Sequence, residues 1–556
     1  MHDLKRIFLE RISGGIRQRS LVDAGRWACT HRIMGPPFPG KWTFFKHPWL
    51  RAMHESKSEI NVGQKAAQLG YTETVLNITF FKIDVEGLDC LYVLPAKTPD
   101  AGDFSAARFD PALELSPHLT NLFSDVKNVG HKRAGSANLY IRGSRSRAGL
   151  KSIPVSLIVL DEVDEFSQEN IPLVFERGSG QRKRDIWMIS TPTINNSGIN
   201  KYYIQSTQEE FYFKCPGCSR YTNLTFPECL EITGDSIFDE KINQSFLKCK
   251  ECDIKLPHET KPEWLAAGKW IAAECDRDIR GFHINQLYSC TEPCKPQNIA
   301  KSYLQSLNDP ADEQIFWNDK IGIPHIVKDA QLTDVLINNC KGDYLNGQVN
   351  RFSPIVTMGI DVGKWIHYEI SAWTLPLYAI GGDINIESVP KTLEIGKLQH
   401  FEELDLKMRS YRVMAAVIDA NPERRKAYEF AMRFRGHVKM CFYGRGITGK
   451  QIHQTKETLD QNEPTITVDR TSWLDLSLGR FRNGSISIPN NVGLEYHEHL
   501  KALVRKYEKD KDGNPIGTYI KGSTTEDHYA HARNYCEIAL PFAAHISSPS
   551  NIRSPI

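Results

Sequence analysis

The stretch Leu157-Ile-Val-Leu-Asp161-Glu162-Val-Asp164-Glu165 decides how this chain is interpreted. Its four apolar residues predict a buried strand of a parallel sheet, and the acids that follow lie at the C-terminal end of that strand. ATP hydrolysis uses two adjacent carboxylates. Asp161 would organise the Mg²⁺ that bridges the β- and γ-phosphates, and Glu162 would orient or deprotonate the attacking water. Taken alone, the stretch is better explained as an ordinary strand with an acidic turn, so the hypothesis requires a phosphate loop elsewhere.

A variant phosphate loop precedes Asp161 by about ninety residues, in Gly63-Gln-Lys65-Ala-Ala-Gln-Leu-Gly70-Tyr71-Thr72-Glu. The usual GxxxxGK[ST] motif does not occur in the 556 residues. In the variant, Gly70 lets backbone N–H groups approach a phosphate, Thr72 can reach Mg²⁺, and Tyr71 between them is a further nucleotide-binding candidate. Lys65 stands at the start of the loop, so it reaches the β- and γ-phosphates only if the loop folds back.

The apolar runs around these motifs predict an α/β domain. Short runs typical of buried parallel strands occupy residues 75–81, 90–94, 157–160 and 186–189. The last run leads into Ser190-Thr191-Pro192-Thr193. Helicase-like motors use small hydroxyl residues in this position to couple the state of the γ-phosphate to movement. A helical stretch near 296–320 is expected to close this half of the chain.

Two CxxC pairs, Cys215-Pro-Gly-Cys218 and Cys249-Lys-Glu-Cys252, indicate a structural metal site. Four thiolates form the tetrahedral set that Zn²⁺ accepts, and they leave no open position for catalysis. Because 30 residues separate the pairs, we expect a β-hairpin over 224–240 within an inserted module spanning 211–260. Reduced thiols and catalytic cysteines are the alternatives. His283 is an additional candidate ligand, although a packed histidine explains it better.

A second α/β pattern begins near residue 354. Met358-Gly-Ile-Asp361-Val-Gly363 places an acid at the exposed end of a buried strand, beside glycines that let a phosphodiester approach. Asp419 repeats the arrangement after the apolar run 415–418. Carboxylates on neighbouring strands can share two divalent ions about 4 Å apart, one activating water and one stabilising the leaving oxygen. Glu369 and Asp383 are expected to be ordinary edge residues.

The overall charge excludes a passive nucleic-acid coat, because 69 Lys and Arg nearly balance 67 Asp and Glu and leave a net charge of +2. Any DNA would therefore bind a local groove. The densest basic clusters are Arg142-Gly-Ser-Arg145-Ser-Arg147, with Lys151 behind it, and Arg182-Lys183-Arg184. A solvated loop explains either cluster as well as phosphate contact does. Since no apolar run of about 18 residues occurs, we expect no membrane segment and a cytosolic protein.

The order of QKAAQLGYTE, LIVLDEVDEF and STPT resembles the large terminase subunit of lambda-like tailed bacteriophages, whose phosphate loop also has a displaced lysine. The resemblance extends, with varying strength, over about residues 20–540 and includes the aromatic segment 42–49, where the family is thought to cover the adenine. It implies a P-loop, RecA- or helicase-like ATPase domain with an inserted zinc module, followed by an RNase H-like nuclease domain. The implied activities are DNA translocation into a procapsid and endonucleolytic cutting of concatemeric DNA.

The resemblance also implies a third nuclease ligand from a C-terminal helix, here over 526–541. Where the family often has an Asp four residues after the leading acid, this chain has His531. Asp527, His531 or both would therefore complete the site. Asp527 is favoured because Mg²⁺ and Mn²⁺ prefer carboxylate oxygen, and His531 remains a metal or leaving-group candidate.

The implied organisation is an adenine-side segment over 1–50, the ATPase domain over 51–325, a linker over 326–350, the nuclease domain over 351–545 and a flexible tail over 546–556. The implied cofactors are ATP, Mg²⁺ or Mn²⁺, and Zn²⁺. The implied partners are double-stranded DNA, a small terminase subunit, the portal of a procapsid and further copies of the chain in a ring, all in the host cytoplasm. One of Arg142, Arg145 and Arg147 would act as an arginine finger.

Two alternatives remain at this point. A cellular helicase or translocase with a non-nucleolytic C-terminal domain shares the ATPase interpretation and differs over Asp361 and Asp419. A non-catalytic, zinc-bearing assembly protein would hydrolyse no nucleotide, and the complete set of ATPase motifs disfavours it.

Overall fold

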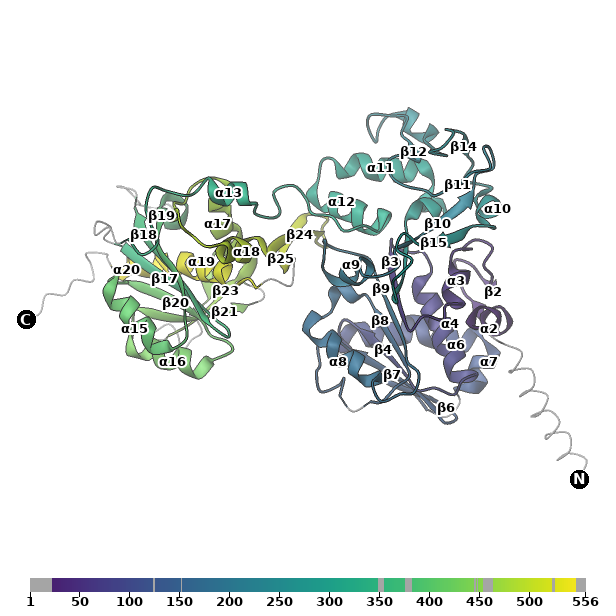
Figure 1. The fold of residues 1–556 in the computed structure, drawn as a ribbon, viewed down its shortest axis with the longest axis horizontal. Helices are drawn as coiled ribbons and strands as arrows, with labels where there is room; N and C mark the ends of the chain where they lie inside the picture. Colours follow the sequence, from purple (N-terminus) through teal and green to yellow (C-terminus); the bar gives the residue numbers. More distant parts are fainter. Residues whose placement is uncertain are drawn as a thin grey trace, which may run out of the picture. The chain divides into compact units, whose positions relative to one another are not determined.

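The computed structural model describes residues 23–123, 126–151, 153–348, 355–375, 383–444, 447, 449–453, 464–522 and 526–546 (Figure 1). The chain divides into two compact units. The first comprises the described residues up to His325 together with Glu508–Pro515, and the second comprises the described residues of Ile326–Tyr507 and Ile516–Ile556. The expected flexible tail, beyond Ile546, lies outside the described residues.

A mostly parallel sheet organises the first unit. The parallel strands within the described residues are, in spatial order, β10 (Glu209–Lys214), β16 (Arg280–Ile284), β3 (Ile60–Lys65), β9 (Asp185–Ser190), β8 (Leu157–Asp161), β4 (Cys90–Leu94) and β7 (Ala137–Gly143). The predicted strands at 90–94, 157–160 and 186–189 are confirmed. Because β9 lies between β3 and β8, the candidate coupling segment that follows β9 emerges between the phosphate loop and the acidic pair.

Helices cover both faces of this sheet. Helices α2 (Ala24–His31), α4 (Tyr71–Asp84) and α6 (Asp110–Leu115) lie on one side of the strands, and α8 (Ile171–Phe175) and α9 (Gly198–Tyr203) lie on the other (Figure 1). The α/β layering expected from the apolar runs is therefore present.

The strand predicted over 75–81 is wrong, because these residues form the middle of helix α4. The run Val75-Leu-Asn-Ile-Thr-Phe-Phe81 is apolar and β-branched without a clear period, and every one of its side chains is buried. A helix that is buried on all sides lacks the amphipathic period that separates helix from strand in a sequence. The phosphate-loop region is thus a strand, a short loop and a helix.

The cysteine pairs flank short strands at one edge of the first unit. The first pair follows β10, and the second lies between β13 (Phe246–Lys248) and β14 (Lys255–Leu256). The hairpin expected over 224–240 has different bounds, since β12 (Leu230–Glu231) pairs with β13 across the 3-10 segment Glu240–Gln244. Farther along the chain, α11 (Pro296–Ser306), α12 (Pro310–Ile315) and the π-helical segment Phe316–Ile321 confirm the predicted helical stretch.

A mixed sheet organises the second unit. Its order is β19 (Val389–Leu398), β18 (Ile366–Thr374), β17 (Ile355–Val362), β20 (Ala415–Asp419), β21 (Val438–Gly444), β23 (Thr465–Asp469) and β22 (Ile452–His453). Strands β17 and β20 are parallel neighbours, with Ile360 opposite Ile418. Asp361 and Asp419 therefore stand at the same end of adjacent strands, as the sequence predicted.

Helix α19 (His528–Ile538) packs across β17 at very close range. A Cβ atom built on Gly359 of β17 would lie 1.9 Å from the carbonyl oxygen of Ala532. Only glycine fits this approach, and the contact brings the start of the helix to the strand end that carries Asp361. The helix predicted over 526–541 is present as α19, and α20 (Leu540–Ile546) continues it.

The segment expected to be a linker, 326–350, contributes to the core of the second unit. It contains α13 (Asp334–Asn338), and Leu332, Ile337 and Cys340 are buried against residues of the same unit. The described part of this segment therefore packs into the second unit and is not a flexible linker. None of the described helices is long and apolar enough to cross a membrane.

Candidate nucleotide, nuclease and thiolate sites

The candidate phosphate loop joins β3 to α4 and occupies residues 66–70. Gly70 adopts a left-handed conformation, with φ of 85°, directly before the helix. A side chain there would also collide with Leu50, because a Cβ would lie 2.7 Å from its Cδ1. The backbone of the loop is held by neighbouring elements, since Ala66 N–H donates to Ile284 and Ala67 N–H donates to Asp319. A loop held before a helix N-terminus is suited to bind phosphate.

Lys65 lies at the end of β3, and its ammonium group faces the acidic pair across β9. Its Nζ lies 3.4 Å from Oε1 of Glu162 and 3.5 Å from the hydroxyl of Thr191. One lysine therefore contacts both the acid proposed to orient water and the segment proposed to sense the γ-phosphate. The displaced lysine does face the candidate site without any refolding of the loop.

Asp161 is a buried carboxylate with one oxygen bound and one free. The hydroxyl of Tyr92 donates a 2.6 Å hydrogen bond to Oδ2, whereas Oδ1 has no hydrogen-bond partner among the described residues. Burial and the neighbouring charge of Glu162 raise the pKa of Asp161 to about 6, although the Thr72 hydroxyl and Lys65 act in the opposite direction. A buried carboxylate oxygen without a partner is costly unless a ligand satisfies it, and a hard cation fits this position.

Glu162 follows in a left-handed backbone conformation, with φ of 63°. That conformation turns its side chain out of the strand, and the side chain is 42% exposed although Asp161 is buried. Strain of this kind in a non-glycine residue is uncommon and is concentrated at functional sites. The adjacent acids therefore have different environments, one suited to a metal and one accessible to water.

The other nucleotide-binding candidates occupy different environments. Thr72 lies on the first turn of α4, within interaction distance of the Asp161 carboxylate. Tyr71 is buried, and its ring packs against Gly63, so its backbone rather than its phenol faces the loop. In the aromatic segment 42–49, Trp49 is fully buried and donates to the Leu69 carbonyl, whereas Phe45 is exposed. Trp49 therefore supports the loop from the interior and leaves no ring surface for an adenine.

The three arginines considered as a finger differ in their contacts. Arg142 is on β7 and donates to the carbonyl oxygens of Gly130 and Ile141. Arg145 and Arg147, in the following turn, are exposed. The guanidinium of Arg142 is therefore engaged within its own sheet, and the two exposed arginines are better candidates to reach a nucleotide.

Asp164 connects the acidic strand to the segment after β9, a role that the sequence did not reveal. Its carboxylate is buried and accepts hydrogen bonds from the backbone N–H groups of Thr193 (2.8 Å) and Ile199 (2.9 Å). Burial raises the pKa of Asp164 to about 6 despite these two donors. On the other side, the Thr193 carbonyl accepts from Gln314 and Asn318 of the helical stretch. Thr193 thus bridges two parts of the first unit.

Asp361 and Asp419 form the centre of the candidate nuclease site. Asp361 is nearly buried on β17, and Asp419 ends β20. Burial and the charge of Asp361 raise the pKa of Asp419 to about 6, although the backbone N–H of Asn421 donates to its Oδ1 at 3.0 Å. A carboxylate whose ionisation is disfavoured by burial and by a neighbouring carboxylate is suited to bind a divalent cation.

The third-ligand candidates lie at the start of α19, and they contact each other. Oδ2 of Asp527 is 3.4 Å from Nε2 of His531. Burial raises the pKa of Asp527, but the hydrogen bond and charge of His531 outweigh it and hold this pKa well below its usual range. The other ring nitrogen of His531, Nδ1, lies 2.9 Å from the Tyr443 hydroxyl. His531 is thus oriented between an acid and a phenol, and its charge influences Asp419.

His528 is a residue of this site that the sequence analysis did not single out. Its Nδ1 lies 2.6 Å from Oδ2 of Asp361, and this hydrogen bond raises the pKa of His528. The ring stacks on His367 at a centroid distance of 4.6 Å. The available signal was its position next to Asp527 on the predicted helix. Among the described residues, Asp361, Asp419 and the α19 candidates do not form a cluster with all ligand atoms within 4.8 Å of one another.

Glu369 is not the ordinary edge residue that was expected. Strand β18 lies between β17 and β19, and Glu369 is fully buried in a charge network. It accepts hydrogen bonds from Arg533 (2.8 Å) and from the Tyr496 hydroxyl (3.0 Å). Arg533 also pairs with Glu537. Asp383 likewise is not on a strand, since it caps helix α14 (Ile384–Glu387). The network anchors α19 to the sheet behind the candidate site.

The four cysteines of the CxxC pairs come together in space. Their sulfur atoms all lie within 4.8 Å of one another, and Sγ of Cys215 is 3.9 Å from Sγ of Cys252. A tetrahedral ion with metal–sulfur bonds of about 2.3 Å requires sulfur separations of roughly 3.8 Å. The two turns also match, because Ser219 and Asp253 both have positive φ and donate to the carbonyl oxygens of Cys215 and Cys249. His283 is outside this set and lies 3.2 Å from the Ile321 carbonyl.

Comparison with known families extends over most of the chain. The model of the ATPase domain of the phage terminase large subunit gpA matches residues 37–270, and the model of the gpA endonuclease domain matches residues 279–547. No curated protein matches the chain.

Several solved terminase structures are similar in part. The large terminase of bacteriophage HK97 is 10% identical, with 93% of this chain and 99% of that chain covered and a TM-score of 0.46. The large terminase ATPase domain of a Thermus phage is 12% identical, with 49% and 91% covered and a TM-score of 0.31. The large terminase nuclease of the thermophilic phage G20c is 13% identical, with 37% and 97% covered and a TM-score of 0.22.

Proposed function

This chain belongs to the gpA family of phage terminase large subunits, with an ATPase domain followed by an endonuclease domain, and from that premise we propose which of its residues perform each activity. It is an enzyme of phage DNA packaging. The match of the endonuclease model to residues 279–547 removes the alternatives of a helicase with a non-nucleolytic C-terminal domain and of a non-catalytic assembly protein.

The contact of Lys65 with both Glu162 and Thr191 carries the proposal for the motor. Lys65 binds the β- and γ-phosphates, the backbone of residues 66–70 cradles them, and Glu162 orients and deprotonates the attacking water. Displacement of the Lys65 ammonium from Glu162 by a phosphate would free that carboxylate for the water. Until a nucleotide binds, Lys65 therefore keeps the Glu162 carboxylate from acting as a base.

Asp161 and Thr72 are the residues that would hold Mg²⁺ in this proposal. The free Oδ1 of Asp161 and the nearby Thr72 hydroxyl are hard oxygen donors, as Mg²⁺ prefers. When bound, the cation supplies charge neutralisation for the phosphates. Tyr92 fixes the orientation of the carboxylate through its hydrogen bond to Oδ2.

For the nuclease, Asp361, Asp419 and Asp527 are proposed to hold Mg²⁺ or Mn²⁺, with His531 as the alternative third ligand. Bound divalent cations would activate water and stabilise the leaving oxygen. His528 and His531 position Asp361 and Asp527 through the contacts described above.

For the cysteine module, one structural Zn²⁺ per chain is proposed on the four thiolates, because the set leaves no open coordination position.

The proposed partners are double-stranded DNA, a small terminase subunit, the portal of a procapsid and further copies of the chain in a packaging ring, in the host cytoplasm. The proposed domain boundary lies near residue 325, where the chain passes from one compact unit to the other. One exposed arginine, Arg145 or Arg147, is proposed to act on the nucleotide of its own or a neighbouring subunit.

The experiment that tests this assignment separates the two activities in the full chain. Glu162→Gln should retain nucleotide binding and lose most ATP hydrolysis, whereas Asp361→Asn should lose plasmid cleavage and retain hydrolysis. Each variant is the control for the other. If Glu162→Gln hydrolysed ATP at the wild-type rate, the motor assignment would be wrong. If Asp361→Asn cut DNA at the wild-type rate, the nuclease assignment would be wrong.

A further inference from the structure

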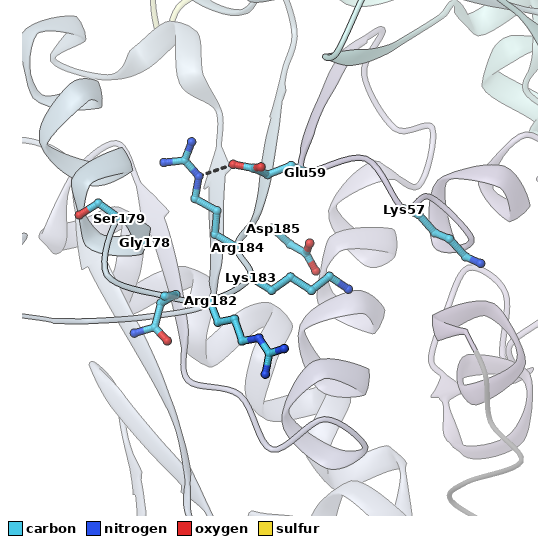
Figure 2. A pocket seen from close by; sticks show the side chains of 9 residues that line it. Lys57, Glu59, Gly178, Ser179, Arg182, Lys183, Arg184 and Asp185 are labelled. Carbon is cyan, nitrogen blue, oxygen red and sulfur yellow. Dashed lines mark hydrogen bonds and ion pairs between the residues drawn. The ribbon is translucent and has the colours of Figure 1, made fainter.

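An open pocket lies at the end of the first unit's sheet that is remote from the nucleotide site. Its walls are the turn before β3 and the loop between the 3-10 segment Glu176–Gly178 and β9 (Figure 2). Strands β3 and β9 are parallel and both begin here, whereas the phosphate loop follows the other end of β3. Six residues of strand span roughly 20 Å, so a ligand in the pocket does not compete with a nucleotide.

The pocket carries positive charge that the protein does not neutralise. Its volume is about 550 Å³, and its charged lining residues are Lys57, Glu59, Arg182, Lys183, Arg184 and Asp185. Glu59 pairs with Arg184, as the dashed line in Figure 2 marks, and Asp185 pairs with Lys82 of helix α4. No carboxylate among the described residues forms an ion pair with Lys57, Arg182 or Lys183. These three cationic side chains are therefore available to bind a ligand in the pocket.

The loop that presents these cations is held in a defined shape. Gln181 accepts a 3.2 Å hydrogen bond from the Ser156 hydroxyl, and its backbone N–H donates to Gly178. Asp185 N–H donates to Ser156, and Ile186 N–H donates to Glu59. A side chain at position 178 would press on Arg184, because a Cβ there would lie 3.2 Å from its Cδ. The charges are thus on an ordered loop, which lowers the entropic cost of binding.

The lining chemistry distinguishes a phosphate polymer from a small molecule. The pocket is lined by charged and small polar residues together with one glycine, and it contains no aromatic or aliphatic side chain. Small-molecule sites are mostly apolar and enclosed, whereas contacts to a nucleic-acid backbone consist of Lys and Arg with hydroxyl and amide groups. The Ser179 hydroxyl and the Gln181 amide supply such neutral groups beside the cations.

We propose that this pocket, formed by Lys57, Arg182 and Lys183, binds the phosphate backbone of double-stranded DNA during translocation. The proposal rests on the DNA-packaging function argued above and assigns one site of contact on the ATPase unit. Because the pocket is at the opposite strand ends from the nucleotide, DNA binding there is separable from hydrolysis. If the chain binds DNA at one end of the sheet and hydrolyses ATP at the other, strands β3 and β9 can transmit the conformational change between the two sites.

Binding of a fluorescent duplex to the full chain, measured between 50 and 200 mM salt, tests the site. Each phosphate contact contributes about 0.9 to the slope of log affinity against log salt, so Arg182→Ala with Lys183→Ala should lower that slope by about 1.8. Lys57→Ala alone should lower it by about 0.9. The matched control is Lys241→Ala with Arg277→Ala, which removes the same charges from exposed positions of the same unit. The control should keep the wild-type slope.

Two further measurements make the outcomes unambiguous. ATP hydrolysis without DNA should be unchanged in every variant, which shows that the unit is folded, while stimulation of hydrolysis by DNA falls in the pocket variants. If the wild-type chain binds duplex and the pocket variants bind with the same affinity and slope, this site is refuted and the packaging assignment is unaffected. If the wild-type chain binds no duplex under any of these conditions, both the site and the proposed DNA translocation are refuted.

Discussion

The backbone N–H of Thr193 donates a 2.8 Å hydrogen bond to the buried carboxylate of Asp164. This contact joins the strand that ends in the two proposed catalytic acids to the segment that Lys65 also contacts through Thr191. The Thr193 carbonyl in turn accepts hydrogen bonds from the helical stretch at Gln314 and Asn318. A change at the γ-phosphate that moves Thr191 therefore has a continuous hydrogen-bonded route to these helices.

Asp164→Asn should weaken both the fold and the motor. Asparagine keeps one carbonyl acceptor but turns an amide toward the second backbone donor, so one buried N–H loses its partner. We expect a loss of about 1–3 kcal/mol in stability of the first unit and a lower rate of ATP hydrolysis. Thermal unfolding and steady-state turnover measure both effects. The control is Asp309→Asn, where a partly exposed carboxylate caps α12 through two backbone donors. Asp309→Asn should leave turnover unchanged, and equal turnover in both variants would contradict the coupling role.

The stability that Asp164 contributes should depend on pH in a defined direction. Its pKa is raised from 3.8 to about 6 in the folded chain, so the folded state binds a proton more tightly than the unfolded state. The stability of the wild type relative to Asp164→Asn should therefore be greatest near pH 4 and should decline as the pH rises through 6. Linkage makes the change of order 2–3 kcal/mol. Denaturant unfolding of both chains between pH 4 and 7 measures it. A difference that grows with pH would contradict the burial argument.

Tyr92→Phe should weaken the use of Mg²⁺ by the motor while preserving the fold. The substitution removes the hydroxyl that holds Oδ2 of Asp161 and leaves the ring stacked on Phe104. Loss of a residue that orients a metal ligand typically costs about 10–100-fold in metal affinity. The Mg²⁺ concentration for half-maximal hydrolysis should rise accordingly, and saturating Mg²⁺ should restore much of the rate. Tyr140→Phe on the neighbouring strand β7 is the control. An unchanged Mg²⁺ requirement in Tyr92→Phe would show that Asp161 needs no orienting partner.

Elemental analysis of the freshly purified chain should find one zinc per molecule. Cys249→Ser should remove that zinc and lower the unfolding temperature, because structural zinc contributes directly to folding. Cys275→Ser, an exposed cysteine outside the cluster, should retain the metal and the unfolding temperature. If the wild-type chain contained no zinc, the four cysteines would instead be reduced thiols without a metal.

The choice of the third nuclease ligand is testable by comparing two variants in Mn²⁺. Asp527→Ala should lower cleavage by about tenfold or more, as loss of a ligand does, whereas His531→Ala should have the smaller effect. If His531 is the ligand, the order reverses. Hydrolysis of ATP by the same preparations is the internal control, since neither residue belongs to the ATPase unit.

The sequence predicted the acidic strand, the cysteine cluster and the neighbouring positions of Asp361 and Asp419 because each depends on local pattern and spacing. It could not predict the partners that come from distant segments. Tyr92 is 69 residues from Asp161 in the chain, and nothing in the run Cys90-Leu-Tyr-Val-Leu94 distinguishes it from a core tyrosine. The same holds for Asp164, whose role depends on where the backbone of residue 193 passes.

Two errors have a common physical origin. The predictions for the run 75–81 and for Glu369 rest on local residue character, whereas burial by other elements determines the structure at both places. A helix covered on all sides has no polar face to reveal its period. A buried glutamate becomes acceptable only when a distant arginine, here Arg533, neutralises it. His528 is a different case, since its position beside Asp527 on a predicted helix was a usable signal.

The close approach at Gly359 limits how this nuclease can be retuned. Because helix α19 touches β17 at Gly359, any larger residue at position 359 would push the helix away from the strand and change the distance between Asp361 and the start of the helix. With this glycine kept, selectivity among divalent ions at the proposed site would be altered through the lengths and rotamers of side chains such as those at 527 and 531. A redesign of the metal preference would therefore change a few side chains and keep Gly359, although this glycine takes no part in the chemistry.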